Sequence, residues 1–114
     1  MPDFSFPKSR HLCGAIRIQT LHRTGRHMVC WPIKVTYLPA ETTQVMVWAP
    51  KRLFKHAVDR NRLKRQLREA WRLHQNDLLT PRQISFFYIA EEQVPFDRIE
   101  KAVIKAVDKL NADR

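Results

Sequence analysis

Glycine and cysteine are both scarce in this chain. Only Gly14 and Gly25 occur among its 114 residues, and the two cysteines are Cys13 and Cys30. A loop that holds phosphate groups through backbone amides needs several closely spaced glycines, so that kind of nucleotide site is excluded. A single possible disulfide does not make a disulfide-stapled scaffold. We therefore expect a protein of the reducing cytoplasm, with thiols that are packed or free.

Long apolar runs are missing as well. No stretch approaches the roughly 20 residues that a membrane-spanning helix requires. The N-terminal sequence MPDFSFPKSR lacks the apolar segment of a secretion signal. Hydrophobic residues still make up 44% of the chain, which is enough for a packed core at this length. We expect residues 1–114 to form a single domain.

Acidic side chains are few and dispersed. The chain has 11 Asp and Glu against 21 Lys and Arg, which gives a formal net charge of +10 and a pI near 10.3. A protein nuclease would need clustered carboxylates to hold Mg²⁺, and the sequence shows neither such a cluster nor a nucleophile with its base. We expect no catalytic residue and no tightly bound cofactor in the protein, but a polyanionic partner.

The histidines and cysteines leave one metal hypothesis open. His27 and Cys30 have the spacing of half a zinc site. His11 and Cys13, two residues apart on an expected helix, would point to different faces. Packed or free thiols are the preferred interpretation, and we expect no metal site.

Hydrophobic periodicity predicts helices at both ends of the chain and in its middle, with strands between them. In chain order we expect a helix at 9–24, strands at 28–38 and 44–49, a helix at 57–75, a strand at 84–90 and a last helix with an apolar face from Ile99 to Leu110. Asp97 with Glu100 resembles a capping box ahead of that helix. One sheet packed with helices makes an α+β sandwich.

The strands differ in character. In 28–38 every second residue from Val29 to Tyr37 is apolar or aromatic, which is typical of a strand with one buried face. A short link at 39–43 suggests that this strand and the next form an antiparallel hairpin, with Pro32 at an edge or bulge. The dense apolar run 84–90 predicts a buried central strand. There we expect core packing for Phe86 and Tyr88, with Tyr88 at a ligand cleft as the alternative.

Most of the net charge, +7 of +10, lies in one fifth of the chain. Between Lys51 and Arg72 there are nine basic side chains and only two acidic ones, Asp59 and Glu69. On the expected helix Leu63, Leu67, Ala70, Trp71 and His74 form one apolar stripe. Asn61, Arg65, Arg68 and Arg72 form a separate row. Arginine forks suit phosphate groups, so the row predicts a polyanion-binding face, with a solvated face bridged by Glu69 as the alternative.

The sequence AVDRNRLKRQLREAWR, at 57–72, resembles the Arg-Asn-Arg signature of the bacterial ribonuclease P protein family. Its core is Arg60-Asn61-Arg62, followed by Lys64-Arg65 and Arg68-Glu69. The pair Lys51-Arg52 resembles the family's basic pair at the end of a strand. A weaker resemblance extends over most of the chain.

The resemblance implies both a fold and a function. The fold would be a single-domain α-β-β-β-α-β-α sandwich with one mostly antiparallel sheet (ribosomal protein S5 domain 2-like). The function would be that of the protein subunit of ribonuclease P, which helps a catalytic RNA remove the 5′ leader of precursor tRNA. The implied partners are that RNA and precursor tRNA. The RNA–protein holoenzyme would require Mg²⁺, and the protein itself would be monomeric.

Family site residues can be carried onto matching positions of this chain. The implied contacts to the catalytic RNA are Lys51, Arg52, Arg60, Asn61, Arg62, Lys64, Arg65 and Arg68. The implied cleft for the leader, between the first helix and the sheet, contains Ile18, His22, Val35 and Tyr37. Ile18 and His22 stand where the family commonly has aromatic residues. Tyr37 is then the main candidate to stack on a base, with Trp48 as a substitute.

Two other functions remain open at this point. The first alternative is a general RNA- or ribosome-associated binding protein without an enzymatic role. The second is a DNA-binding helix, although strands rather than a partner helix precede 57–75.

Overall fold

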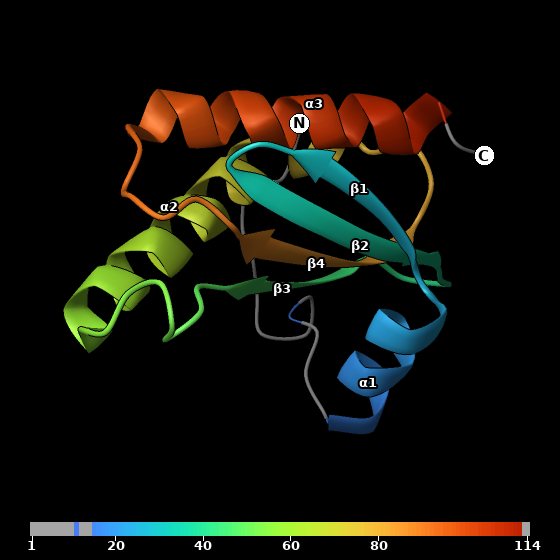
Figure 1. The fold of residues 1–114 in the computed structure, drawn as a ribbon. Coiled ribbons are helices and arrows are strands. Elements are labelled where there is room, and N and C mark those ends of the chain that lie inside the picture. Colours follow the sequence, from blue (N-terminus) through green and yellow to red (C-terminus); the bar gives the residue numbers. More distant parts are fainter. Residues whose placement is uncertain (1–10, 12–14, 113–114) are drawn as a thin grey trace.

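The computed structural model describes His11 and residues 15–112, and shows one sheet with helices on both faces (Figure 1). Its elements are α1 (Ala15–Thr24), β1 (Arg26–Cys30), β2 (Ile33–Pro39), β3 (Gln44–Trp48), α2 (Ala57–His74), the 3-10 turn η2 (Gln75–Asp77), β4 (Arg82–Tyr88) and α3 (Phe96–Ala112). The expected α-β-β-β-α-β-α order is confirmed. No described helix is long and apolar enough to cross a membrane.

The sheet is mixed, and its strands run in the order β1-β2-β4-β3. β2 pairs antiparallel with β1 and β4, whereas β3 pairs parallel with β4. The predicted strand 28–38 is therefore two strands, and Trp31 and Pro32 form the turn between them. The expected hairpin of this strand with 44–49 is wrong, because β4 lies between β2 and β3. β4 pairs with a neighbouring strand on both sides, and none of its residues is exposed.

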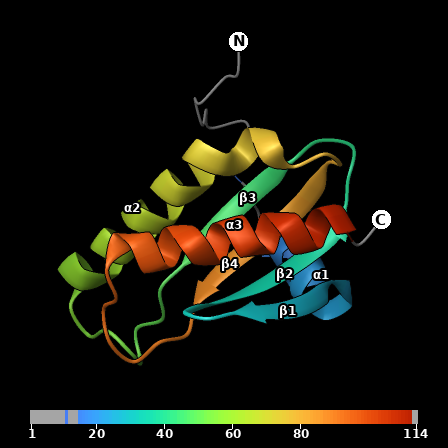
Figure 2. The same ribbon diagram turned by 90° about the horizontal axis from the view of Figure 1, so that it is seen from above.

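The hydrophobic core fills the face of the sheet that α2 and α3 cover (Figure 2). Leu63, Leu67, Ala70 and Trp71 of α2 are buried as predicted, and the Trp71 ring lies 5.8 Å from that of Phe86. His74 is half-buried, and its Nε2 lies 3.1 Å from the Glu100 carboxylate on α3. The apolar face of α3, which begins at Ile99, is buried too.

One local prediction for this layer is wrong and another is confirmed. Asp97 lies inside the first turn of α3, which begins at Phe96, so it cannot be the N-cap of a capping box. Tyr88 does not face a cleft: it is fully buried, as core packing requires. Its hydroxyl donates to the Glu92 carbonyl at 2.6 Å and accepts from the Val94 amide at 3.1 Å. Burial raises the pKa of Tyr88.

α1 covers the opposite face of the sheet and ends at Thr24, directly before Gly25 as predicted. The residues before Ala15 in the predicted helix 9–24 lie outside the described part, except His11, which bridges to Val45 of β3. The Gly25 amide donates to the Leu21 carbonyl at 2.8 Å. A Cβ on Gly25 would lie 2.4 Å from that carbonyl oxygen and 2.9 Å from Cγ2 of Thr36.

Gly25→Ala is therefore expected to lower the free energy of unfolding by about 1–3 kcal/mol, the usual cost of overpacking. The helix end and β2 must move apart to admit the methyl group. Urea unfolding followed by circular dichroism measures the loss. Gln19→Ala, on the exposed side of α1, is the control and should stay within about 0.5 kcal/mol of the original. An unfolding free energy unchanged by Gly25→Ala would show that this contact is not tight.

Candidate nucleic-acid interface

The outer face of α2 presents a row of basic side chains. Asn61, Arg62, Arg65 and Arg68 are exposed, and Lys64 is half-buried beside them. The buried stripe around Leu67 fixes which way this face points, because rotating the helix would expose the core residues. The structure thus places six of the eight predicted RNA contacts on α2, and five of them on its outer face.

Glu69 neutralises only the end of this row. Arg72 donates to both of its carboxylate oxygens, from Nε at 3.0 Å and from Nη2 at 2.6 Å. These hydrogen bonds hold the pKa of Glu69 below its usual value. Within the described residues, no carboxylate forms an ion pair with Arg62, Arg65 or Arg68. The alternative of a row bridged by Glu69 from Arg65 to Arg72 is therefore wrong.

Arg60 has a different setting from the other predicted contacts. Its Nη1 donates to the carbonyls of Phe54 and Lys55, each at 2.8 Å. Phe54 in turn is buried with its ring edge-on to Tyr88, at 5.6 Å between centroids. These contacts tie the loop between β3 and α2 to the core. Arg60 is first of all a positioning residue for that loop.

The loop carries the two remaining predicted contacts. Lys51 and Arg52 are exposed in the turn after β3. Arg52 also lines a hollow on the α1 side of the sheet, of about 500 Å³, together with His22, His27, Lys34, Thr36, Phe87 and Ile89. The loop therefore connects the basic face of α2 with this hollow, which we call the α1 cleft.

Hydrogen bonds fix two histidines of the α1 cleft. Nε2 of His22 lies 3.3 Å from the Ser85 hydroxyl, and Nδ1 of His27 lies 2.9 Å from the Thr36 hydroxyl. The half-buried ring of Phe87 and the exposed Lys34 come from neighbouring strands in direct register. The α1 cleft thus offers an aromatic ring, two cations and two imidazoles.

Only one of the four predicted cleft residues lines the α1 cleft. His22 does, whereas Ile18 is half-buried on α1 outside its lining. Val35 (0% exposed) and Tyr37 (6%) face the other way, into the core under α2 and α3, so their assignment to the cleft is wrong. Side chains alternate along a strand, and the cleft-facing residues of β2 are Lys34 and Thr36.

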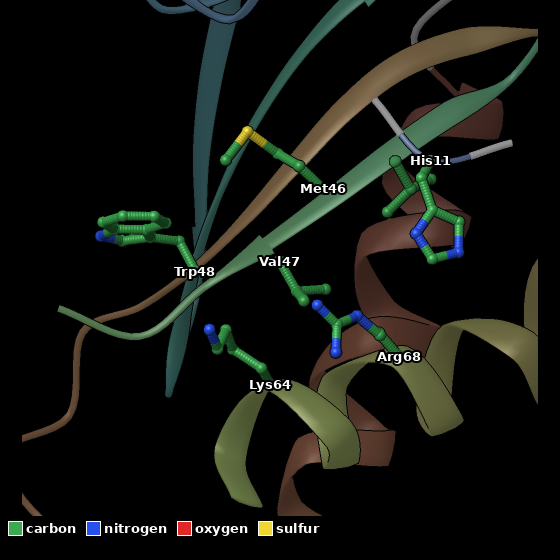
Figure 3. A pocket seen from close by; sticks show the side chains of 7 residues that line it. His11, Met46, Val47, Trp48, Lys64 and Arg68 are labelled. Atoms are coloured by element: carbon green, nitrogen blue, oxygen red, sulfur yellow. The ribbon is translucent and has the colours of Figure 1, made fainter. Parts of the chain in front are cut away.

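A second hollow, at the outer edge of β3, was not predicted. It measures about 230 Å³ and is lined by His11, Val45, Met46, Val47, Trp48, Lys64 and Arg68. Figure 3 shows Lys64 and Arg68 rising from α2 toward β3, with Trp48 at one end and His11 at the other. We call it the β3-edge hollow. Sequence spacing could not reveal it, because it depends on α2 lying beside β3.

The zinc hypothesis fails on geometry. Cys30 is buried in the core. His27 is on the opposite face of β1, where its Nδ1 lies within hydrogen-bond distance of the Thr36 hydroxyl. Cys13 lies outside the described residues. Within the described part, no three His, Cys, Asp or Glu side chains are placed to hold a metal. Burial raises the pKa of the Cys30 thiol, which keeps it protonated and a poor metal ligand.

These features define a class: a small α+β protein with a rigid cationic helix face and a cationic, aromatic cleft, suited to a polyanion such as RNA. Comparison with known proteins gives the family. Residues 6–111 match the family model described as Ribonuclease P. The Porphyromonas gingivalis (strain W83) ribonuclease P protein component is 33% identical, over 96% of this chain and 88% of that protein.

Solved structures agree on the fold. The Staphylococcus aureus RNase P protein superimposes with a TM-score of 0.76 and 18% identity, over 90% of this chain and 95% of that one. The Thermotoga maritima RNase P protein superimposes with a TM-score of 0.77 and 15% identity, over 87% of this chain and 96% of that one. The chain belongs to the ribonuclease P protein family. It is thus a protein component of a ribonucleoprotein endoribonuclease with a role in tRNA 5′-end processing.

Proposed function

We propose that this chain binds the catalytic RNA of ribonuclease P through the exposed face of α2, and the 5′ leader of precursor tRNA in the α1 cleft. The observation that carries the first half is the set of exposed arginines, Arg62, Arg65 and Arg68, without a described carboxylate partner. Like charges one helical turn apart repel each other, so the row is best matched by a polyanion. The planar fork of arginine can bind two phosphate oxygens at once.

The role of this face is assembly. Fixed positive charge on a rigid helix lowers the repulsion among RNA phosphates as the RNA subunit folds against it. The requirement for Mg²⁺ belongs, in this proposal, to the RNA–protein holoenzyme. The described side chains provide no group of three His, Cys, Asp or Glu that could hold a metal ion. Hydrolysis is assigned to the RNA subunit.

The α1 cleft suits a single strand better than a duplex. Phe87 offers a ring for a base to stack on, and Lys34 and Arg52 offer charges for the backbone. A base paired in a duplex cannot leave its stack to reach a ring inside a cleft. The 5′ leader of precursor tRNA is an unpaired segment of this kind, and mature tRNA lacks it.

Three narrower expectations complete the proposal. We expect residues 1–114 to act as one domain, the protein to be a monomer before it joins the RNA, and the complex to work in the cytoplasm. Sedimentation of the free protein tests the second of these, because a monomer and a dimer of a 13.6 kDa chain separate clearly.

Reconstitution tests the function as a whole. The purified chain is mixed with a bacterial ribonuclease P RNA and precursor tRNA at low Mg²⁺. We expect cleavage at the mature 5′ end only when both components are present. Tight RNA binding without stimulated cleavage would favour the general RNA-binding alternative. Cleavage by the RNA-free protein would place an active site in the chain itself and contradict the proposal.

Phe87→Leu tests the cleft. Leucine keeps the site apolar but removes the ring, so the affinity of the holoenzyme for precursor tRNA should fall about fivefold, the lower end of base–aromatic stacking. Mature tRNA, which has no leader, should bind as before. Filter binding of both tRNAs measures the difference. Equal losses for precursor and mature tRNA would contradict a leader site at Phe87.

A further inference from the structure

The β3-edge hollow has a chemistry of its own, beyond the general charge of α2. Trp48, the last residue of β3, is 47% exposed although it is a large aromatic residue. The alternate residues Val45 and Val47 are buried in the core, so Trp48 points to the other side of the strand. A half-exposed indole at a sheet edge is available for a flat ligand to stack on.

Two cations face the same hollow. Lys64 and Arg68 are four residues apart on α2, and therefore lie one above the other on the same side of the helix. Figure 3 shows both side chains rising from α2 on the side of β3. No carboxylate is among the described lining residues, so the charge of this pair is not cancelled inside the hollow. A ligand here would be anionic at one end.

The hollow also lies beside the α1 cleft. In the sheet register Trp48 stands opposite Phe87 of β4, and Phe87 stands opposite Lys34 of β2. Adjacent strands are about 4.8 Å apart, so the rings of Trp48 and Phe87 start from neighbouring backbone positions. A single RNA strand could pass from one hollow to the other across the end of β3.

We propose that the β3-edge hollow binds one unpaired nucleotide of RNA, with its base stacked on Trp48 and its phosphate held by Lys64 and Arg68. An aromatic ring beside two cations matches the base and the phosphate of a nucleotide. The hollow has a volume of about 230 Å³, which is below the range for pockets that enclose a whole drug-sized ligand. This volume suits a single nucleotide. A paired base would not be free to reach Trp48.

This inference rests on the proposed function, because it requires the protein to meet RNA with unpaired segments. The nucleotide could come from the catalytic RNA that α2 binds or from the leader in the adjacent cleft. The chemistry is the same in both cases, and separate binding measurements tell the sources apart.

Tryptophan fluorescence tests the site directly. The chain has three tryptophans, and Trp71 is only 2% exposed, so Trp31→Phe leaves Trp48 as the one indole that solvent or ligand can reach. A single-stranded hexa-adenylate should quench this emission saturably, whereas a blunt RNA duplex should not. Lys64→Ala combined with Arg68→Ala should raise the hexa-adenylate concentration needed for half-maximal quenching about tenfold. Absent quenching, or equal quenching by the duplex, would overturn the proposal.

Affinity measurements use a matched pair of variants. Trp48→Ala should lower RNA affinity about tenfold, and Trp48→Phe should restore most of it because phenylalanine still stacks. Trp31→Ala removes an indole of nearly equal exposure, 49%, on the opposite edge of the sheet, and should change nothing. A loss for the catalytic RNA alone identifies it as the source; a loss confined to leader-bearing tRNA identifies the leader. Wild-type affinity of Trp48→Ala for both RNAs would overturn the site.

The two proposals can fail separately. If the unaltered chain does not stimulate 5′ cleavage by the RNA subunit, the proposed function fails. If it does stimulate cleavage and Trp48→Ala binds and stimulates like the original, only the nucleotide site is wrong. Thermal unfolding of each variant shows whether a loss reflects the fold instead, and an equal loss in Trp48→Ala and Trp31→Ala would also overturn the site.

Discussion

Arg62→Ala combined with Arg65→Ala is expected to weaken the complex with the catalytic RNA about 50-fold at 0.15 M salt. Both side chains are exposed on α2, and neither has a described carboxylate partner. Each charged hydrogen bond to phosphate contributes about 1.5–3 kcal/mol, and the two contributions need not add fully. The plot of log affinity against log salt should also become shallower by about two units, one for each phosphate that the variant no longer neutralises.

The control for this variant removes the same charge from another helix. Lys105→Ala combined with Lys109→Ala acts on the exposed side of α3. Salt screens charges beyond about 8 Å, so this variant should leave the salt slope within about half a unit of the original. Fluorescence anisotropy of labelled RNA over a salt series measures the affinity and the salt slope of each variant. An equal effect of the two variants would mean that net charge, rather than the α2 face, governs binding.

Trp71→Ala is expected to lower the free energy of unfolding by about 3–5 kcal/mol, the largest stability effect we predict. Trp71 is 2% exposed and joins α2 to the sheet through its contact with Phe86. Alanine would leave a cavity between the helix and β4. Because this contact also orients the basic face, RNA affinity should fall as well when the helix loosens.

Urea unfolding followed by circular dichroism measures the loss of unfolding free energy, and Trp31→Ala is the matched control. Trp31 stands in the β1–β2 turn at 49% exposure, near the Arg98 guanidinium. Its removal should cost less than about 1 kcal/mol, the value of an exposed cation–π contact. A similar loss for both variants would contradict the placement of Trp71 at the centre of the core.

Periodicity was a sound guide wherever burial alone decides the structure. The α2 stripe from Leu63 to Trp71 and the central β4 strand follow from apolar spacing, and the outward row of arginines follows from the same helix. Alternation in 28–38 predicted correctly that Val35 and Tyr37 face a buried side. It was wrong for Val29 and Trp31, which are exposed, because a turn divides this segment into two strands.

The assignment of Val35 and Tyr37 to the leader cleft came from family resemblance, and it failed because a shift of one residue along a strand moves a side chain to the other face.

Features that depend on strand order could not be predicted. The insertion of β4 between β2 and β3 brings together segments some 40 residues apart, and no local pattern announces that pairing. The same insertion places Phe87, which lines the α1 cleft, between Lys34 of β2 and Trp48, which lines the β3-edge hollow. The role of Arg60 could not be predicted for a related reason. It donates to backbone carbonyls, which every residue has, so the sequence does not show which of them accepts.

Lysine acetylation of the protein, free and bound to the catalytic RNA, tests the central claim most directly. Mass spectrometry then reports the reactivity of each lysine. RNA bound to the α2 face should lower the reactivity of Lys51 and Lys64, on the loop and on α2, while the exposed Lys101, Lys105 and Lys109 of α3 should keep theirs. Protection of the α3 lysines with Lys51 and Lys64 still reactive would place the RNA on the other helix and contradict the account.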